Sequence, residues 1–490
     1  MVELTECCLV KVPALPEPTG FPENNGYCGR TDAGSTRIRS VRTQFVHKLE
    51  KQGDDMATDL AKIAKERKLE YFLISFVDYF GVLRAKLVPA SAIAGMQKNG
   101  AGFAAFAAWL DSTPADPDML VIPDADSLVI LPWKPEVGWL AGDCWMDGAE
   151  MTDTPRVMLK NQLNKATKLG YRMKTGVEAE FFLLTPDGSD LSDPLDTQGK
   201  PCYDQSALMR RYDVITEICD SMTALGWGPY QNDHEDANGQ FEMNWDYDDA
   251  LKTADRHVFF KFMTRTIAES HGVRATFMPK PFASLTGNGC HAHVSLWDKT
   301  GRKNLFYDPK GELGLSGLAY NFLAGVLQNA AAMCSVWNPS VNSYKRINAP
   351  VTSSGATWSP NSIAYGGNNR STMVRIPDAG RIELRLMDGA ANPYLLQAGI
   401  LVAGLDGINN KRDPGKRIDF NLYTEGHKVR GLRKLPLNLL DAVRLTDKDK
   451  NLRNGFGDSF IDSYVRLKNR QWNDYAGSLS QWERDNTLDC

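Results

Sequence analysis

The sequence TGVEAEFFLL, residues 175–184, places two glutamates at alternate positions of an otherwise apolar run. Alternate residues of a β-strand point to the same face, so Glu178 and Glu180 are expected to share one site. The flanking Val177 and Phe181 favour a buried strand, in which two carboxylates are costly without a cation. A solvent-facing pair is the alternative for so short a motif.

Further segments of the same half of the chain place polar residues in strand-like surroundings. They are NDHEDANGQFEMNW (232–245), TGNGCHAHVSL (286–296), NPSVNSYKRI (338–347), GNNRSTMVRIP (367–377) and GRIELRLMDG (380–389). In the second of these, His291 and His293 again share a face of a strand. The candidate residues of the other segments are Glu235, Glu242, Lys345, Arg346, Arg370, Arg375, Arg381, Glu383 and Arg385.

This set of residue types indicates phosphate chemistry. Five glutamates and a histidine suit Mg²⁺ or Mn²⁺, which prefer oxygen ligands and tolerate an imidazole. Arginines suit phosphates and a carboxylate substrate, because the guanidinium group binds both in a bidentate way. No serine or cysteine nucleophile motif accompanies them, which favours phosphoryl transfer. The residues alone do not identify the phosphoryl acceptor.

Length and composition indicate an ordinary globular protein with two domains. The chain has 490 residues, 42% hydrophobic and 24% charged residues, and a net charge of −4, which gives no reason to expect a nucleic acid partner. Its nine cysteines are scattered without a CxxC pair and predict a reducing compartment. Apolar runs such as 395–405 are about half the length of the ~20 residues that a membrane span needs, so we expect no membrane partner. We expect a cytoplasmic location, with organellar targeting by the N-terminal segment left open.

The order of strand-like and helical patterns divides the chain into three parts. Residues 1–55 are rich in Pro, Gly and polar groups and predict a flexible extension. Residues 56–150 predict a small domain with a helix at 56–68 and a buried strand at 71–77. Residues 155–490 predict a larger domain that opens with a helix ending at Gly170 and closes with one or two helices after Ser459.

These motifs resemble the glutamine synthetase family, nearest to its type III glutamate–ammonia ligase branch, which grades into glutamate–methylamine ligases. VEAEFF, HEDANGQFE, TFMPKPF, GNGCHAHVS, NPSVNSYKR, NNRSTMVRIP and RIELR occur in the order of the family. The resemblance implies an α+β fold: an N-terminal β-grasp domain, then a catalytic domain with a curved antiparallel sheet flanked by helices. It also implies a homo-oligomer, a dodecamer of two hexameric rings with each active site between neighbouring subunits.

The resemblance also implies roles for single residues, with ATP, L-glutamate and ammonia or a small amine as substrates. The metal ligands on the glutamate side would be Glu180, Glu235 and Glu242. The metal ligands on the nucleotide side would be Glu178, His291 and Glu383. The residues near ATP would be His293, Ser295, Arg375 and Arg381. The catalytic arginines would be Arg346, Arg370 and Arg375. The residues that bind glutamate would be Gly287, Arg346 and Arg385.

The sequence departs from the family at two acids of the ammonium site. The aspartate of the family's FDGSS motif falls on GFAAFAAW, at Ala104, and the flap glutamate falls within NAPVTSSGATW, near Thr352. Losing two carboxylates weakens binding of a small hydrated cation and leaves room for an alkyl group. Ammonia is nevertheless the expected acceptor, because it is the commonest in the family; the alternative is methylamine or another small alkylamine.

Two alternatives from other classes are less well supported. A phosphagen-type kinase shares the metal–arginine chemistry, but GNGCHAHVS and NPSVNSYKR are typical of the ligases. A ring protein without catalytic activity is expected to lose metal ligands first, since unpaired buried carboxylates destabilise a fold. All six proposed ligands are present, which favours an enzyme.

Overall fold

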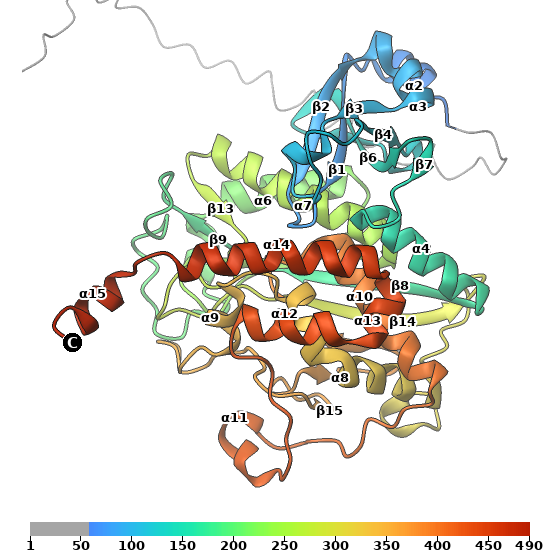
Figure 1. Ribbon diagram of the computed structural model, residues 1–490. Coiled ribbons are helices and arrows are strands. Elements are labelled where there is room, and N and C mark those ends of the chain that lie inside the picture. Colours follow the sequence, from blue (N-terminus) through green and yellow to red (C-terminus); the bar gives the residue numbers. More distant parts are fainter. Residues whose placement is uncertain (1–57) are drawn as a thin grey trace, which may run out of the picture. The chain divides into compact units, whose positions relative to one another are not determined.

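The N-terminal part of the chain is a sheet built around one long strand, β6. The computed structural model describes residues 58–490. The sheet has the order β2-β1-β6-β4-β3, with β5 and β7 also paired to β6, and only β1 and β6 run parallel (Figure 1). Its strands are β1 Tyr71–Val77, β2 Leu83–Pro89, β3 Ala101–Phe103, β4 Met119–Pro123, β5 Val129–Leu131, β6 Lys134–Met146 and β7 Ala149–Glu150.

The strand and the helix that the sequence predicts for this sheet region are both present in the structure. β1 coincides with the predicted strand 71–77, and its residues Phe72, Ile74, Phe76 and Val77 are buried. α2, Leu60–Arg67, lies inside the predicted helix 56–68 and begins after Asp59, whose carboxylate accepts from the N–H groups of Ala61 and Lys62. The expected extension 1–55 lies outside the described residues.

Two further sheets, both mostly antiparallel, form the remainder of the β-structure. One has six strands in the order β12-β8-β14-β17-β16-β15, and the other has four in the order β10-β11-β9-β13. Their strands are β8 Tyr171–Ala179, β9 Phe181–Leu184, β10 Pro229–His234, β11 Gln240–Trp245, β12 Asp248–Asp249, β13 Arg274–Thr276, β14 Cys290–Asp298, β15 Tyr365–Gly366, β16 Val374–Arg375 and β17 Ile382–Leu384.

The chain passes from one of these sheets to the other at Glu180. β8 belongs to the six-stranded sheet and β9 to the four-stranded sheet, and Glu180 alone separates them. The run 175–184, which the sequence pattern presents as one strand, is therefore two strands in two sheets. This junction places the Glu180 side chain where both sheets meet.

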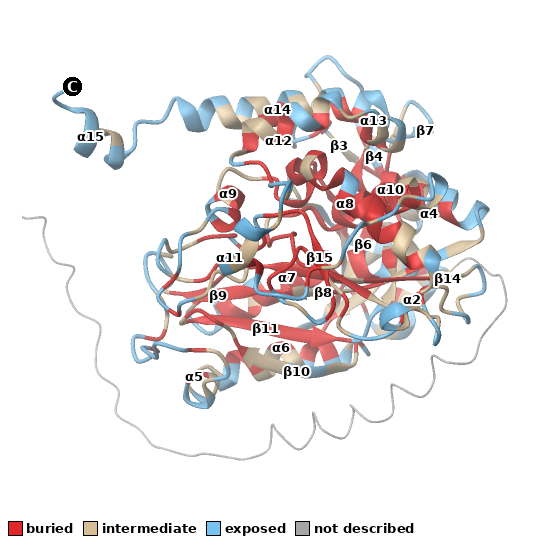
Figure 2. Ribbon diagram, turned by 90° about the horizontal axis from the view of Figure 1, so that it is seen from below, coloured by how far each residue is buried: buried red, intermediate tan, exposed pale blue. Residues whose placement is uncertain are grey.

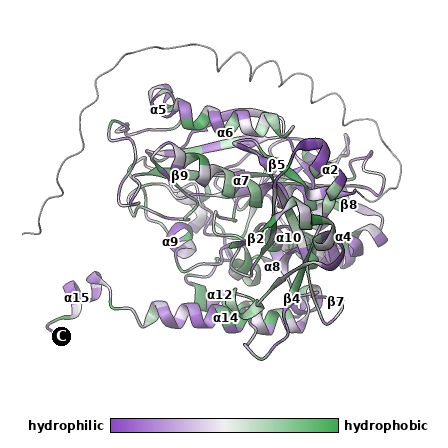
Figure 3. Cartoon of the chain, turned by 90° about the horizontal axis from the view of Figure 1, so that it is seen from above, coloured by the Kyte–Doolittle hydropathy of each residue, from purple (hydrophilic) through white to green (hydrophobic). Residues whose placement is uncertain are grey.

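Helices flank these sheets, and the most apolar of them is buried on nearly every side. α10 packs against α8, α4 and α7. Glycines permit the close approach of α8 and α10, because a Cβ on Gly404 would lie 2.0 Å from the Phe322 ring. The apolar run 395–405 is thus a buried helix of the core (Figures 2 and 3).

The helices of the described residues range from single turns to six turns. They are α2 Leu60–Arg67, α3 Ile93–Asn99, α4 Pro155–Lys168, α5 Gln205–Arg210, α6 Tyr212–Ala224, α7 Ala250–Ser270, α8 Gly317–Trp337, α9 Ser343–Ile347, α10 Pro393–Asn409, α11 Leu422–Glu425, α12 Leu439–Lys448, α13 Lys450–Phe456, α14 Asp458–Ala476 and α15 Gln481–Thr487. Within residues 58–490, none is both long and apolar enough to cross a bilayer.

The expected α+β class is confirmed, with an N-terminal sheet followed by sheets flanked by helices. The described residues, 58–490, belong to one compact unit. The expected boundary near residue 150 falls between β7 and α4 and stays a prediction. The helix predicted from Pro155 is α4, and Gly170 follows its end with a φ of 89°, a conformation that favours glycine.

Candidate active site

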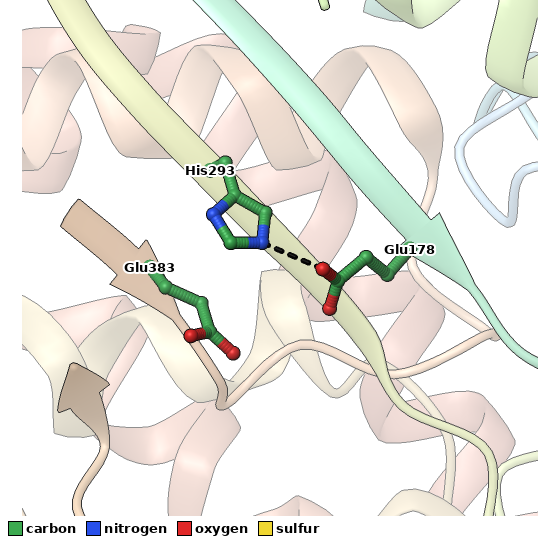
Figure 4. A group of neighbouring side chains, drawn as sticks. All are labelled: Glu178, His293 and Glu383. Atoms are coloured by element: carbon green, nitrogen blue, oxygen red, sulfur yellow. Dashed lines mark hydrogen bonds and ion pairs between the residues drawn. The ribbon is translucent and has the colours of Figure 1, made fainter. Parts of the chain in front are cut away.

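The strand register of the six-stranded sheet brings together residues that are far apart in the sequence. β14 pairs with β8 so that His291 lies opposite Glu178, and it pairs with β17 so that His293 lies opposite Glu383. Figure 4 shows Glu178, His293 and Glu383 converging from these three strands. Glu178, His293 and Glu383 offer ligand atoms that all lie within 4.8 Å of one another, and so do Glu178, Glu242 and His291.

Hydrogen bonds fix the orientation and tautomer of His293. Nη1 of Arg381 lies 2.9 Å from Nδ1 of His293, and Nε2 of His293 lies 2.7 Å from Oε1 of Glu178. Because a guanidinium group only donates, Nδ1 accepts and Nε2 carries the proton that Glu178 accepts. His291 Nδ1 lies 3.1 Å from the other oxygen of Glu178. Burial opposes ionisation of Glu178, but the two histidines hold its pKa well below the ordinary value.

Glu180 is held by its neighbours on one oxygen. Its Oε2 accepts from the backbone N–H of Gly289 at 2.7 Å and from Nε2 of Gln240 at 3.0 Å. Its Oε1 lies 3.8 Å from Nε2 of His291. Hydrogen bonds to Oε2 therefore orient the Glu180 side chain, while its Oε1 remains close to His291. This is expected if Glu180 and His291 share one site.

A third group consists of carboxylates alone. Asp233, Glu235 and Glu242 offer oxygens within 4.8 Å of one another. Burial, with the charges of Glu180 and Asp233, raises the pKa of Glu235 well above its ordinary value. Burial and nearby glutamates likewise raise the pKa of Glu242 strongly and that of Asp233 to about 6. Burial and mutual repulsion therefore oppose the simultaneous ionisation of Asp233, Glu235 and Glu242, and a cation between them would relieve this repulsion.

The donor chemistry of these groups fits divalent metals. Carboxylate oxygens in close groups with an imidazole are the ligands that Mg²⁺ and Mn²⁺ accept, and such a cation would offset the repulsion that raises these pKa values. The grouping differs from the expected one in two respects. Asp233 joins Glu235 and Glu242, and His293 joins Glu178 and Glu383. Within residues 58–490, Glu180 is in none of the three groups.

Two arginines form ion pairs with Glu383 in the buried centre of the site. Nη1 of Arg375 and Nη1 of Arg385 each lie 2.6 Å from one of its oxygens. Burial opposes ionisation of Glu383, but Arg385 and His291 hold its pKa at about 2. Nε of Arg385 is buried without a hydrogen-bond partner among residues 58–490. This donor is available to an anionic group.

The residues predicted to bind glutamate lie beside this centre. Arg346 is buried, and its Nη1 donates to the carbonyl of Leu386 at 3.0 Å. Burial lowers the pKa of Arg346 despite the opposing charges of Asp388 and Glu180. A Cβ on Gly287 would lie 2.2 Å from the Pro279 carbonyl, so this position requires glycine.

Arg370 differs from the other predicted arginines because it is exposed. It lies in the turn between β15 and β16 and makes no hydrogen bond or ion pair within residues 58–490. The charge of Arg370 offsets part of the rise in the pKa of Asp233, so Arg370 lies near the group formed by Asp233, Glu235 and Glu242. A cation in this position is free to reach an incoming ligand.

A pocket of about 250 Å³ adjoins the metal-ligand groups. Glu178, His293, Arg381 and Ser295 line it, and the Ser295 hydroxyl accepts from Nε1 of Trp297 at 2.9 Å. Its wall also includes the aromatic residues Tyr230, Trp245, Tyr247 and Trp297. An aromatic wall beside phosphate-binding chemistry suits a nucleotide base.

The two positions that lack the expected acids are placed differently. Ala104 is exposed, immediately before the turn Ala105–Ala107. Thr352 is buried, and its hydroxyl lies 3.0 Å from that of Ser354 and 3.5 Å from that of Thr286. Neither position carries a charge.

Sequence reasoning missed several residues of the site. Asp233 lies two positions before Glu235, and Gln240 two before Glu242, so the period-two rule applied within the same motif would have found both. Tyr230 and Tyr247 are unusually exposed aromatic residues at 66% and 55%, a signal that only the structure reveals. Gly289 is identified only from the structure, because a Cβ at this position would lie too close to His291 and Glu180.

Comparisons with known proteins agree with this geometry. The family model "Glutamine synthetase, catalytic domain" matches residues 152–487. A glutamine synthetase of Rhizobium leguminosarum bv. phaseoli is 60% identical over 434 residues, covering 89% of this chain and all of the relative. A glutamate–methylamine ligase of Methyloversatilis universalis is 41% identical over 441 residues, covering 88% of this chain and 99% of the relative.

Solved structures give a second comparison. A structure of GmaS, a glutamate–methylamine ligase, in complex with ADP superposes with a TM-score of 0.86 at 63% identity. It covers 89% of this chain and 100% of the solved chain. A GmaS structure without ligand gives a TM-score of 0.85 at 62% identity, with coverage of 88% and 100%.

Proposed function

Because the chain belongs to the glutamine synthetase family of ATP-dependent glutamate ligases, we propose that its amine substrate is methylamine or another small alkylamine. The product would be the γ-glutamyl alkylamide, formed with release of ADP and phosphate. Ammonia was the expected acceptor from the sequence, on frequency alone. The likeness to two GmaS structures and to a glutamate–methylamine ligase favours the alkylamine instead.

The observation that carries this proposal is the missing charge of the acceptor half-site. The two family acids that would bind ammonium correspond to Ala104 and Thr352. Thr352 is uncharged and already hydrogen-bonded, so it does not compensate a small cation. Ala104 to Ala108 carry alanines and Phe106, which offer apolar contact to an alkyl group.

The phosphate half-site is intact, and its residues suit the first step. The γ-carboxylate of glutamate attacks the γ-phosphate of ATP to give γ-glutamyl phosphate, and a neutral amine then displaces phosphate. Divalent cations held by the two carboxylate–histidine groups and by the group of three carboxylates would neutralise phosphate charge when bound. Arg370 and Arg375 would stabilise the transferring phosphoryl group, and Arg346 and Arg385 would hold the glutamate carboxylate.

Glutamine synthesis from ammonia is the second candidate. Two Rhizobium relatives named glutamine synthetase, at 60% and 59% identity, favour it. These relatives and the GmaS structures cover nearly the same share of the chain, so the likeness to GmaS supports the alkylamine together with the uncharged residues Ala104 and Thr352, and not by itself.

We also propose the ring assembly that the family resemblance implies. Apolar residues are exposed in and around α15: Trp482 in the helix at 67%, Leu479 just before it at 69% and Leu488 just after it at 72%. Such a patch favours contact with another subunit. Light scattering coupled to size-exclusion chromatography should give a mass near twelve chains; a monomer would reject the assembly.

The test of the proposed function is the rate of phosphate release from ATP with Mg²⁺ and L-glutamate. Saturation curves with methylammonium, ethylammonium and ammonium give kcat/KM for each amine. We expect an alkylamine to have the highest value. A higher kcat/KM for ammonium would make the protein a glutamine synthetase whose ammonium site uses other groups.

A further inference from the structure

Asp236 is a buried carboxylate whose partners are hydroxyl and thiol groups. It is 6% exposed, and none of the ion pairs among residues 58–490 includes it. Its Oδ2 accepts from the hydroxyl of Thr286 at 2.8 Å and from the hydroxyl of Ser354, and its Oδ1 accepts from the thiol of Cys202 at 3.5 Å. A buried carboxylate without a cation is costly unless its oxygens are hydrogen-bonded, so these donors stabilise it.

Ser354 belongs to the flap segment, defined here as residues 349–357. Besides Ser354, the hydroxyl of Thr352 joins the same cluster, 3.5 Å from the hydroxyl of Thr286. The backbone N–H of Ser353 donates to the carbonyl of Ser284 at 2.9 Å. Thr352 and Ser354 are buried at 7% and 4%, whereas Val351 is 75% exposed. The flap segment is therefore anchored by its two buried hydroxyls.

The cluster of Asp236, Thr286, Thr352 and Ser354 is connected to the candidate active site at three points. Asp236 follows Glu235, and its N–H donates to Oε2 of Glu235 at 3.1 Å. Thr286 precedes Gly287, which is predicted to bind glutamate. The flap segment is followed directly by Trp358, whose carbonyl lies 3.4 Å from Nη2 of Arg385. The cluster is thus linked to Glu235, Gly287 and Arg385, which are the residues expected on the glutamate side.

We propose that Asp236 is a positioning residue that holds the flap segment over the acceptor site, in the place of the family's flap glutamate. The inference rests on the proposed function in that it takes this side of the site to be where the amine enters. Asp236 acts through Ser354 and Thr286 and does not contact the amine. Both of its oxygens already accept hydrogen bonds, so most of its acceptor capacity is used by Thr286, Ser354 and Cys202 and not by an ammonium ion.

Closure matters because γ-glutamyl phosphate reacts with water as well as with an amine. A closed site excludes water from the activated acyl group. The hydrogen bond between Ser354 and Asp236 therefore controls how much γ-glutamyl phosphate is hydrolysed. Hydrolysis releases phosphate but forms no amide. The fraction of phosphate released without amide therefore measures the position of the flap segment.

The test compares the full-length protein with Ser354→Ala, which removes one donor to Asp236. We expect the excess of phosphate over amide to rise about 10-fold, the effect of losing one hydrogen bond to a charged group. The KM for the amine should rise, while the KM for ATP stays unchanged. Ser354→Thr keeps a hydroxyl and should restore coupling. The matched control is Ser353→Ala, since within residues 58–490 this neighbour bonds to Ser284 and not to Asp236, and it should behave as the parent protein.

Asp236→Asn, alone and combined with Ser354→Ala, tests whether the two residues act together. Residues that share one hydrogen bond give non-additive effects, so the double variant should be no worse than the more affected single variant. If Asp236→Asn does not fold, Ser354→Ala and its controls decide. The proposal would be overturned if Ser354→Ala kept the phosphate-to-amide ratio and the amine KM of the parent protein. It would also be overturned if the KM values of all substrates rose equally, or if the effects in the double variant were additive.

The failure of this inference and that of the proposed function are distinguishable. The ratio of phosphate to amide is measured with whichever amine the parent protein uses best. If ammonium proves to be that amine, the alkylamine proposal falls. The role of Asp236 is then still decided by the ratio in Ser354→Ala.

Discussion

The backbone N–H of Gly289 donates a hydrogen bond to Oε2 of Glu180 over 2.7 Å, so the loop before β14 holds the carboxylate that separates the two sheets. A Cβ on Gly289 would lie 2.7 Å from Nε2 of His291 and 2.8 Å from Oε1 of Glu180. Both distances are too short for a carbon atom. The glycine therefore leaves open the space between two predicted metal ligands.

Gly289→Ala should fill this space and lower ligase activity by about 10²-fold, the cost of misplacing groups at a reacting centre. Mn²⁺ binding, followed by calorimetry, should weaken in the same variant. Gly199→Ala is the matched control, because a Cβ there would meet nothing within 4 Å. Normal Mn²⁺ affinity and activity in Gly289→Ala would place the metal elsewhere.

Glu180→Ala should abolish amide synthesis while the protein keeps its fold. The variant removes a proposed metal ligand, whose Oε2 is bound by Gly289 and Gln240. Circular dichroism checks the fold, and phosphate release checks activity. Full activity in this variant would contradict the assignment of Glu180 as a metal ligand.

Arg370→Ala should reduce kcat by about 10²-fold or more, as removal of one stabilising group from a charged transition state does. Arg370 is exposed, so its loss should leave thermal stability unchanged. Arg430→Ala, another exposed arginine outside the candidate site, serves as the control. An unchanged kcat in Arg370→Ala would move the phosphoryl site away from this turn.

Period-two patterns predicted the local arrangement well but not the path of the chain between sheets. His291 and His293 share a face of β14 as expected, and both contact Glu178. The run 175–184 reads as one strand, because an apolar pattern does not reveal where a strand leaves one sheet for another. That change occurs at Glu180 and depends on the distant Gly289, which pattern reasoning along the chain does not reach.

The membership of the candidate site was predictable from motifs, and its grouping was not. The predicted glutamates and His291 lie in one region, but the oxygens that approach those of Glu235 and Glu242 belong to Asp233, and the role of Glu180 as a ligand stays a prediction. Which oxygens approach one another depends on register and side-chain rotamers, and neither follows from spacing. The hydroxyl cluster around Asp236 was equally hidden, since serine and threonine in a loop are ordinary residues until the fold buries them.

Ala104→Asp should raise the use of ammonium relative to methylamine, because a carboxylate favours a small hydrated cation. Ratios of kcat/KM for the two amines measure the effect. Ala107→Asp, a second exposed position of the same turn, is the control and should leave the ratio as it is. An unchanged ratio in Ala104→Asp would discredit the alignment of this position with the family's aspartate.

Lys468 should make stability depend on pH above neutrality. Burial lowers its pKa from 10.5 to about 7, and its Nζ donates to the carbonyl of Pro339 at 2.7 Å. Between these two pKa values the unfolded chain binds more protons than the folded one, so this lysine's contribution to the unfolding free energy rises with pH. The advantage of Lys468→Met over the parent protein should accordingly shrink as pH rises from 7 to 10.5.

Denaturant unfolding at several pH values in this window measures that difference. Lys450→Met, at an exposed lysine, should differ from the parent protein by the same amount at every pH. A constant difference for Lys468→Met as well would mean that Lys468 keeps its ordinary pKa in the folded state.

The most direct test of the central claim is a competition between methylammonium and ammonium at equal concentration, with ATP, Mg²⁺ and L-glutamate. Mass spectrometry of the amide products reads the choice of acceptor within one reaction, independent of how phosphate is counted. The proposed function predicts that γ-glutamylmethylamide exceeds glutamine. A product that is mainly glutamine would contradict it.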